Sequence, residues 1–217
     1  MKVYFENTDI WGFEGAIRGM RNPKNSWGKS DSYHEPANFC DCSFVIGDDD
    51  MVLAKRLIGA GNEHAKFMRM IHVQTDLTLP RAIWQELDTY HFGTKNSCST
   101  MHKLLDSKTP ITTSLFEYND GEEDIIQAIV QRLETLRELY TVADDAKTKN
   151  WLLMRAKMIL PEGFLQMRTW DTNYAELRNI YFQRRYHRMP HWRDICTWIE
   201  SLPYSELITY EKGREDE

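Results

Sequence analysis

The sequence predicts a mixed fold of the α/β (α+β) class, with a few strands and predominantly long helices. Residues 2–6 and 66–77 alternate apolar with polar side chains, as half-buried strands do. The second half of the chain instead repeats apolar residues at helical spacing, most clearly over 120–145. With 217 residues, of which 41% are hydrophobic, the chain suits one large domain or two small ones, and we expect a single domain over 1–217.

The N-terminal part is predicted to contain one strand and one short helix before a long loop. After the strand at 2–6, residues 12–22 fit a helix that ends where Pro23 follows Asn22. Residues 23–43 are rich in Pro, Asn, Ser, Gly and Asp, which favours a loop. We expect residues 1–45 to form a variable N-terminal segment.

The next segments are predicted to form a helix, a strand and a second helix. Residues 51–61 can form a helix with one apolar face, made by Val52, Leu53, Leu57 and Ile58. The three aspartates at 48–50 can cap it, because carboxylates accept hydrogen bonds from the N–H groups at a helix start. The strand follows at 66–77, and Pro80 then suits the first turn of a helix over Arg81–Asp88.

The second half of the chain is predicted to be mainly helical. The helix at 120–145 can be capped by Asp120, and its expected apolar stripe is Ile125, Ile129, Leu133, Leu136 and Leu139 or Tyr140. Further helices are expected over 146–159, ending at Leu160-Pro161, over 172–187, and from Pro190 to just before Pro203. Residues 205–217 are predicted to be a frayed charged tail.

Composition narrows the class of partner. A net charge of −6 and a pI near 5.7 argue against a general duplex-DNA binder, whose phosphate contacts need a basic face. The sequence holds no apolar run of membrane-spanning length and does not begin like a signal peptide, so we predict a cytoplasmic protein. Its four cysteines are then expected to be reduced. Cys40, Cys42 and His34 are too few ligands for a zinc site, and we predict no metal.

One polar loop, residues 89–103, suggests ligand binding. Its segment from Asn96 to Thr100 (Asn96, Ser97, Cys98, Ser99 and Thr100) offers successive N–H groups and hydroxyls. Such a set suits a phosphate or a pyrimidine edge. The alternative is a solvated turn into a helix at 100–106 that Ser99 caps.

Other candidate residues are distributed along the chain. Glu63-His64 could orient a ligand or act in proton transfer, or it could be an ordinary surface pair. Lys157 and the Arg184-Arg185 pair could bind phosphate or carboxylate, or face solvent. Asn173 and Asn179 are six residues apart and therefore lie close to one helical face, although Asn173 is equally explained as a cap.

The order of these motifs resembles that of the flavin-dependent thymidylate synthase (ThyX) family. Glu63-His64-x-x-Phe67 is similar to the family's E-H-x-x-F, and Gly93-Thr94-x-Asn96-x-x-Ser99 is similar to part of its R-H-R-x-x-S-x-N-x-x-S-x-R signature. Residues 156–161, AKMILP, are similar to A-R-x-x-L-P, and 173–184 to the N-A-R-x-L-x-x-F-L-x-x-R helix. Trp192-x-x-Ile195 is similar to A-Q-W-E-I. The resemblance runs from about residue 50 to 200.

This resemblance implies a ThyX-like fold with a central mixed sheet, assembled as a homotetramer with sites between subunits. It further implies FAD as cofactor and reductive methylation of dUMP at C5. Methylenetetrahydrofolate and NADPH would be the co-substrates by the same resemblance.

By position in the family motifs, the resemblance also implies roles for individual residues. Ser99 and Arg184 match residues next to the reacting pyrimidine, and Asn96 to Thr100, Lys157 and Arg184 or Arg185 would bind the substrate. The cofactor would meet Glu63, Tyr90, His91, Asn96, Asn173 and Asn179.

The sequence also departs from the family signature. The R-H-R triplet falls on Thr89-Tyr90-His91, and the final Arg falls on Met101. Each replacement of Arg by a neutral residue removes a charge-assisted hydrogen bond, worth about 1.5–3 kcal/mol. Two alternatives to dUMP methylation therefore stay open: an enzyme that modifies a different pyrimidine nucleotide, for example by hydroxymethylation, and a non-catalytic nucleotide-binding protein.

Overall fold

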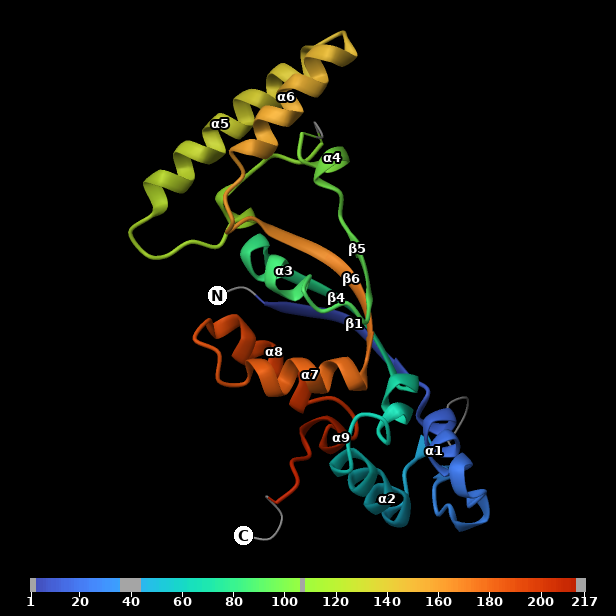
Figure 1. Ribbon diagram of the computed structural model, residues 1–217. Coiled ribbons are helices and arrows are strands. Elements are labelled where there is room, and N and C mark those ends of the chain that lie inside the picture. Colours follow the sequence, from blue (N-terminus) through green and yellow to red (C-terminus); the bar gives the residue numbers. More distant parts are fainter. Residues whose placement is uncertain (1–2, 36–43, 106–107, 214–217) are drawn as a thin grey trace. The chain divides into compact units, whose positions relative to one another are not determined.

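The computed structural model describes residues 3–35, 44–105 and 108–213 (Figure 1). The chain divides into two compact units. Unit 1 comprises Met1–Glu6, Asp76–Thr89 and Lys95–Thr169, and unit 2 comprises Asn7–Thr75, Tyr90–Thr94 and Trp170–Glu217. The single domain over 1–217 stays a prediction. Cys40 and Cys42 lie outside the described residues.

The described strands form a main sheet and a small two-stranded sheet. The main sheet has the order β1-β4-β6-β5, from β1 (Tyr4–Trp11), β4 (His72–Pro80), β6 (Leu165–Asn173) and β5 (Thr94–Ser97). The second sheet pairs β2 (Tyr33–His34) antiparallel with β3 (Phe44–Val45). Strands and helices together confirm the predicted mixed α+β class.

The central strand β4 shows why its sequence folds this way. Val73, Thr75, Leu77 and Leu79 are fully buried, and they alternate with more exposed neighbours. This period of two is the signature of a strand with one face in the core. Four of the described strands were not predicted: β6, β5, which lies inside the expected loop 89–103, β2, which lies inside the expected loop 23–43, and β3.

Unit 1 contains a helical hairpin with its own core. Its helices are α3 (Arg81–Leu87), α4 (Thr100–Lys103), α5 (Glu123–Val142) and α6 (Ala146–Met158). The two longer helices, α5 and α6, pack side by side (Figure 1). Their shared core includes Leu133, Leu136, Leu152 and Leu153.

The predicted apolar stripe of α5 is partly wrong. Leu133 and Leu136 are buried, but Ile125 is 58% exposed and Leu139 is 47% exposed. Ile126 and Val130 are buried in their place, because the helix turns a slightly different face to its partner α6. Asp120 does not cap the helix, since Glu122 occupies the N-cap position.

Unit 2 packs helices around α7. Its helices are α1 (Phe13–Arg21), α2 (Asp48–Gly59), α7 (Tyr174–Arg184), α8 (Pro190–Glu200) and α9 (Glu206–Thr209), with short 3₁₀ turns at Asn22–Lys24, Trp27–Lys29 and Lys66–Met70. Helix α7 contacts α8, α9 and the turn at Lys66–Met70. Leu177 and Ile180 of α7 are fully buried, as predicted, and Tyr181 is 8% exposed.

Three predictions are corrected in unit 2. Lys66–Met70 is a 3₁₀ turn and not a strand, because the adjacent Phe67 and Met68 are both buried, which a period of two forbids. Helix α7 begins at Tyr174, because Thr172 and Asn173 complete β6. The tail is packed at α9, since Leu207 and Ile208 are fully buried, and it is exposed at 212–213.

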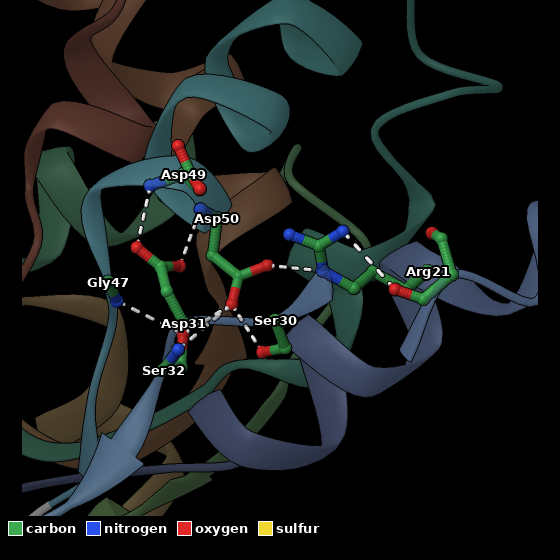
Figure 2. Close-up of polar contacts among 8 residues, drawn as sticks. Arg21, Ser30, Asp31, Ser32, Gly47, Asp49 and Asp50 are labelled. Carbon is green, nitrogen blue, oxygen red and sulfur yellow. Dashed lines mark hydrogen bonds and ion pairs between the residues drawn. The ribbon is translucent and has the colours of Figure 1, made fainter. Parts of the chain in front are cut away.

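The start of α2 is held by a residue that precedes it by 17 positions. The carboxylate of Asp31 accepts from Asp49 N at 2.8 Å and from Asp50 N at 3.0 Å (Figure 2). The expected capping by the aspartates at 48–50 is therefore wrong. Asp50 instead turns inward and is fully buried.

Among the described residues, none of the helices has the length and apolar character needed to cross a membrane.

Candidate functional site

A cavity of about 380 Å³ lies beside α7 in unit 2, and we call it the α7 pocket. Two of the predicted cofactor residues, Asn173 and Asn179, line it. The rest of the lining is Asn62, Ala65, Met68, Arg69, Phe92, Ala175, Glu176, Arg178 and Phe182. The pocket therefore combines amide groups, guanidinium groups and aromatic rings, which is the mixture that heterocyclic ligands require.

The β6–α7 junction places the two asparagines. Asn173 is the N-cap of α7, and its side-chain oxygen accepts from Glu176 N at 3.0 Å. The expected alternative role as a cap is thus observed, and the residue also lines the pocket. Asn179 lies six residues later, about 120° short of two full helical turns, so the expected common helical face is wrong. The two residues nevertheless line the same pocket.

Arginines on two sides of the pocket meet aromatic rings. The Arg69 guanidinium lies 5.8 Å from the ring centre of Phe92, and that of Arg178 lies 4.5 Å from the ring centre of Phe182. Arg178 also donates to the carbonyls of Ile208 and Tyr210, at 2.7 and 2.6 Å. Burial lowers the pKa of Arg178. Arg178 therefore ties α7 to the α9 segment.

Arg184, at the end of α7, is clamped by two aromatic side chains. Its Nε donates to the hydroxyl of Tyr90 at 2.8 Å, and its guanidinium lies 4.4 Å from the ring centre of Trp192. The rings of Tyr90 and Trp192 meet edge to face at 6.1 Å. This arrangement fixes both the position and the plane of the positive charge.

A chain of hydrogen bonds connects this clamp to the α7 pocket. The Tyr90 hydroxyl donates to Gln183 Oε1 at 2.9 Å, and Gln183 Nε2 donates to Asn179 Oδ1 at 2.7 Å. Arg184, which the resemblance places at the pyrimidine, is thereby linked to Asn179, which it places at the cofactor. Tyr90 is 6% exposed, so its hydroxyl acts within the protein.

The neighbouring Arg185 has a different environment. Its two terminal nitrogens approach the carboxylate of Glu211 at 3.1 to 3.3 Å. The bonds to Glu211 raise the pKa of Arg185. Arg185 is thus held by an ion pair within unit 2, whereas Arg184 is held by Tyr90 and Trp192.

The predicted substrate segment from Asn96 to Thr100 belongs to unit 1. Asn96 and Ser97 end β5, and Cys98 N donates to Met167 O at 3.0 Å, so this N–H group is engaged within the protein. The Ser99 hydroxyl accepts from Met101 N at 3.2 Å and caps α4. The alternative interpretation, in which Ser99 is a helix cap, is therefore observed.

Lys157, near the end of α6, reaches this segment. Its Nζ lies 3.1 Å from the sulfur of Met101, in the first turn of α4. Unit 1 thus brings Lys157 to Met101, the residue after the predicted substrate segment, across 56 positions of sequence. A lysine ammonium group is a usual partner of phosphate.

The remaining predicted residues lie elsewhere in unit 2. His91 is exposed, next to the pocket residue Phe92. Glu63 and His64 line a second cavity and not the α7 pocket, although the adjacent Asn62 and Ala65 line the latter.

Sequence reasoning missed several residues of the site. Arg69 was placed on a strand, and Phe92, Phe182 and Gln183 were not singled out. The aromatic Phe92 within the polar stretch 89–103 was a usable sequence signal, and the structure shows it 66% exposed. Within the described residues, no three His, Cys, Asp or Glu side chains are grouped to hold a metal ion.

Comparison with known proteins decides the fold. No protein-family model matches the sequence, and no curated protein sequence matches it significantly. A solved structure of flavin-dependent thymidylate synthase ThyX from Helicobacter pylori, complexed with FAD and dUMP, superposes with a TM-score of 0.68. It covers 97% of this chain and 98% of the other, at 19% identity.

This chain has the ThyX fold. A second structure of the Helicobacter pylori ThyX with FAD and dUMP gives a TM-score of 0.67 at 17% identity, covering 97% of both chains. The UMP/dUMP methylase PolB from Streptomyces cacaoi, bound with 5-Br dUMP, gives 0.61 at 13% identity, covering 96% of this chain and 95% of the other. The predicted likeness to ThyX is confirmed at the level of the fold.

Proposed function

We propose that this chain binds a pyrimidine deoxynucleotide and FAD, and that it transfers a one-carbon unit to C5 of dUMP. The observation that carries the proposal is the likeness, over 97% of the chain, to a structure complexed with FAD and dUMP. The α7 pocket supports it, because two residues that match flavin-side positions, Asn173 and Asn179, line one cavity.

The α7 pocket fits part of a flavin cofactor. Its walls offer the aromatic rings of Phe92 and Phe182 for apolar contact and the amides of Asn62, Asn173 and Asn179 for hydrogen bonding. A volume of about 380 Å³ is near the lower end of small-molecule sites. It suits one ring system, and the remainder of a dinucleotide would need contacts outside this pocket. When bound, reduced FAD supplies the hydride that no side chain can provide.

Arg184 is proposed to act on the pyrimidine. Uracil C5 is a weak nucleophile, and a fixed cation at a ring carbonyl favours the enolate-like form that attacks from C5. The bond from Nε to Tyr90 holds the guanidinium in one plane before substrate arrives. Tyr90 is thus proposed to be a positioning residue.

The unit 1 segment is proposed to hold the nucleotide. Lys157 would pair with the phosphate, and the hydroxyls of Ser97 and Thr100 would donate to it. Ser99 would meet the pyrimidine edge while it also caps α4. The active site would be completed between subunits of a homotetramer, with methylenetetrahydrofolate and NADPH as co-substrates, in a cytoplasmic setting.

A reconstitution experiment tests the proposal. Purified protein is incubated with FAD and desalted, and flavin absorbance and dUMP calorimetry are recorded. The product with methylenetetrahydrofolate and NADPH is then weighed by mass spectrometry. Retained flavin, dUMP binding and a methylated product support the proposal. A colourless protein that retains no added FAD would contradict it.

A second candidate is modification of a different pyrimidine nucleotide. It is favoured by the loss of the signature arginines at Thr89-Tyr90-His91 and Met101, and by the likeness to PolB, a UMP/dUMP methylase. A panel of dUMP, UMP and dCMP separates the two candidates, because only the true substrate gives a heavier product. Binding of a nucleotide without turnover of any panel member would instead indicate a non-catalytic nucleotide-binding protein.

A further inference from the structure

Unit 2 contains a second, larger cavity between α1, α2 and the turn at Lys66–Met70, and we call it the α1–α2 pocket. Its volume is about 730 Å³, well within the range of small-molecule sites. It shares no lining residue with the α7 pocket.

The charged residues of this pocket are mostly cations. Lys24, Lys29, Arg56 and Lys66 line it, with His64, and Glu63 is the one carboxylate of the lining. In the described part of the chain, no ion pair involves these four cations. On a chain with net charge −6, a cavity bordered by cations concentrates positive potential and attracts anions.

The fifth cation of the lining, Arg21, serves the structure. It is 6% exposed, and its Nε donates to the buried carboxylate of Asp50 at 2.5 Å (Figure 2). Its Nη1 also donates to Ser26 O at 3.3 Å, inside the segment that carries Lys24 and Lys29. Arg21 is therefore a neutralised support for the wall and not a ligand-binding charge.

Asp50 holds the other end of the same segment. Its second carboxylate oxygen accepts from the hydroxyls of Ser30 and Ser32, at 2.5 and 2.6 Å (Figure 2). The chain from Ser26 to Ser30 is thus bound at both ends to the Arg21–Asp50 pair. The two lysines project from a fixed backbone, which lowers the ordering cost of binding.

The inner surface of the pocket is apolar. Phe67 and Met20 are buried, and Leu53, Leu57 and Met70 are more exposed. A small inorganic ion would use the cations alone and leave this surface in contact with water. A larger organic anion would cover it.

We infer that the α1–α2 pocket binds a phosphorylated organic molecule. Its phosphate or diphosphate group pairs with Lys24, Lys29, Arg56 and Lys66, and its organic part packs on Leu53, Leu57 and Met70. Lysine and arginine are the usual partners of phosphate, and the apolar wall selects for an organic substituent.

The test uses ADP as probe, with inorganic pyrophosphate and adenosine for comparison, and full-length, flavin-free protein. Calorimetry should show that ADP binds more tightly than either part alone. Equal affinity of ADP and pyrophosphate would overturn the role of the apolar wall. No binding of ADP at low ionic strength would overturn the whole inference.

Charge variants test whether ADP binds in the α1–α2 pocket. Lys24→Gln with Lys66→Gln should weaken ADP binding by about tenfold or more, since each removes a charge-assisted contact. The matched control is Lys147→Gln with Lys149→Gln in α6, which makes the same change of net charge in unit 1 and should leave the affinity unchanged. Equal loss in both variants would mean nonspecific attraction and contradict the inference.

The inference stands apart from the proposed function. ADP titration needs neither flavin nor methyl donor, so its outcome does not depend on nucleotide methylation. ADP is also one half of FAD, and Glu63 of this pocket is a predicted cofactor residue. The variant Lys24→Gln with Lys66→Gln should therefore retain added FAD as the parent protein does, and loss of FAD together with ADP would overturn the assignment to a separate site.

Discussion

The two cavities of unit 2 differ in how their arginines and lysines are used. In the α7 pocket, Arg178 bonds to backbone carbonyls and Arg69 faces a phenyl ring. In the α1–α2 pocket, Arg21 is neutralised by Asp50, and Lys24 and Lys66 take part in no described ion pair. The first cavity is therefore suited to a neutral heterocycle, and the second to a phosphate.

The difference shows that counting basic residues does not identify an anion site. What matters is whether a carboxylate or a carbonyl already satisfies each cation. Arg184 and Arg185 are adjacent in sequence but have different partners, since Arg185 pairs with Glu211 and Arg184 contacts Tyr90 and Trp192.

The largest effect is expected for Asp50→Asn, which breaks the wall of the α1–α2 pocket. It leaves Arg21 buried without its countercharge, and removal of one partner of a buried pair costs about 3–5 kcal/mol. Urea unfolding should show this loss. Asp49→Asn is the control, because Asp49 is exposed in the same turn, and its stability should be nearly that of the parent protein.

Acid should weaken the same wall. Burial alone would raise the pKa of Asp50, but hydrogen bonds from Ser30, Ser32 and Arg21 lower it below the ordinary 3.8. A carboxylate with a lowered folded-state pKa stabilises the protein above its unfolded pKa, and this stability is lost as pH falls through the folded value. Unfolding free energy measured below about pH 4 should therefore fall more steeply in the parent protein than in Asp50→Asn.

The next largest effect is expected for Arg184→Gln in the proposed reaction. Removal of a fixed charge at a developing oxyanion costs about 10²–10³ in kcat. Arg185→Gln is the comparison: it should lower stability by breaking the pair with Glu211 and change kcat far less. Equal loss of kcat in the two variants would contradict the distinction between these arginines.

A smaller effect is expected for Tyr90→Phe, which keeps the ring beside Trp192 and removes the hydroxyl. The lost bond to Arg184 is charge-assisted and worth about 1.5–3 kcal/mol. As a positioning change it should lower kcat by about tenfold to a hundredfold with little change in KM. A variant with unchanged kcat would show that the aromatic faces alone position Arg184.

The smallest effect is expected in unit 1, for Ser99→Ala. Loss of an N-cap side chain costs about 0.5–2 kcal/mol, and thermal unfolding should report it. Ser99→Thr should restore the cap, since its hydroxyl can accept from Met101 N. If Ser99 also meets the pyrimidine, dUMP affinity falls in the Ala variant beyond what the loss of stability explains.

The helices were predicted well where a proline marks the start or the end of the helix. Helices α6 and α8 were found because Pro161 follows the first and Pro190 begins the second. Strand β6 was missed, because its alternation is masked by polar residues such as Arg168 and Thr169, which bond to Asp88 and Asp76 of unit 1. The face of α5 was placed only in part, since its partner α6 sets which residues are buried.

The sequence by itself determined the class of fold, the positions of most helices and the order of motifs that resembles ThyX. Helical stripes and proline positions are local properties, and motif order needs no coordinates. The tertiary structure decided which charges are paired. It showed that Asp31 and not Asp48–Asp50 caps α2, that Arg185 meets Glu211, and that Tyr90 holds Arg184. These pairs join residues far apart in the chain, and only packing brings their atoms within bonding distance.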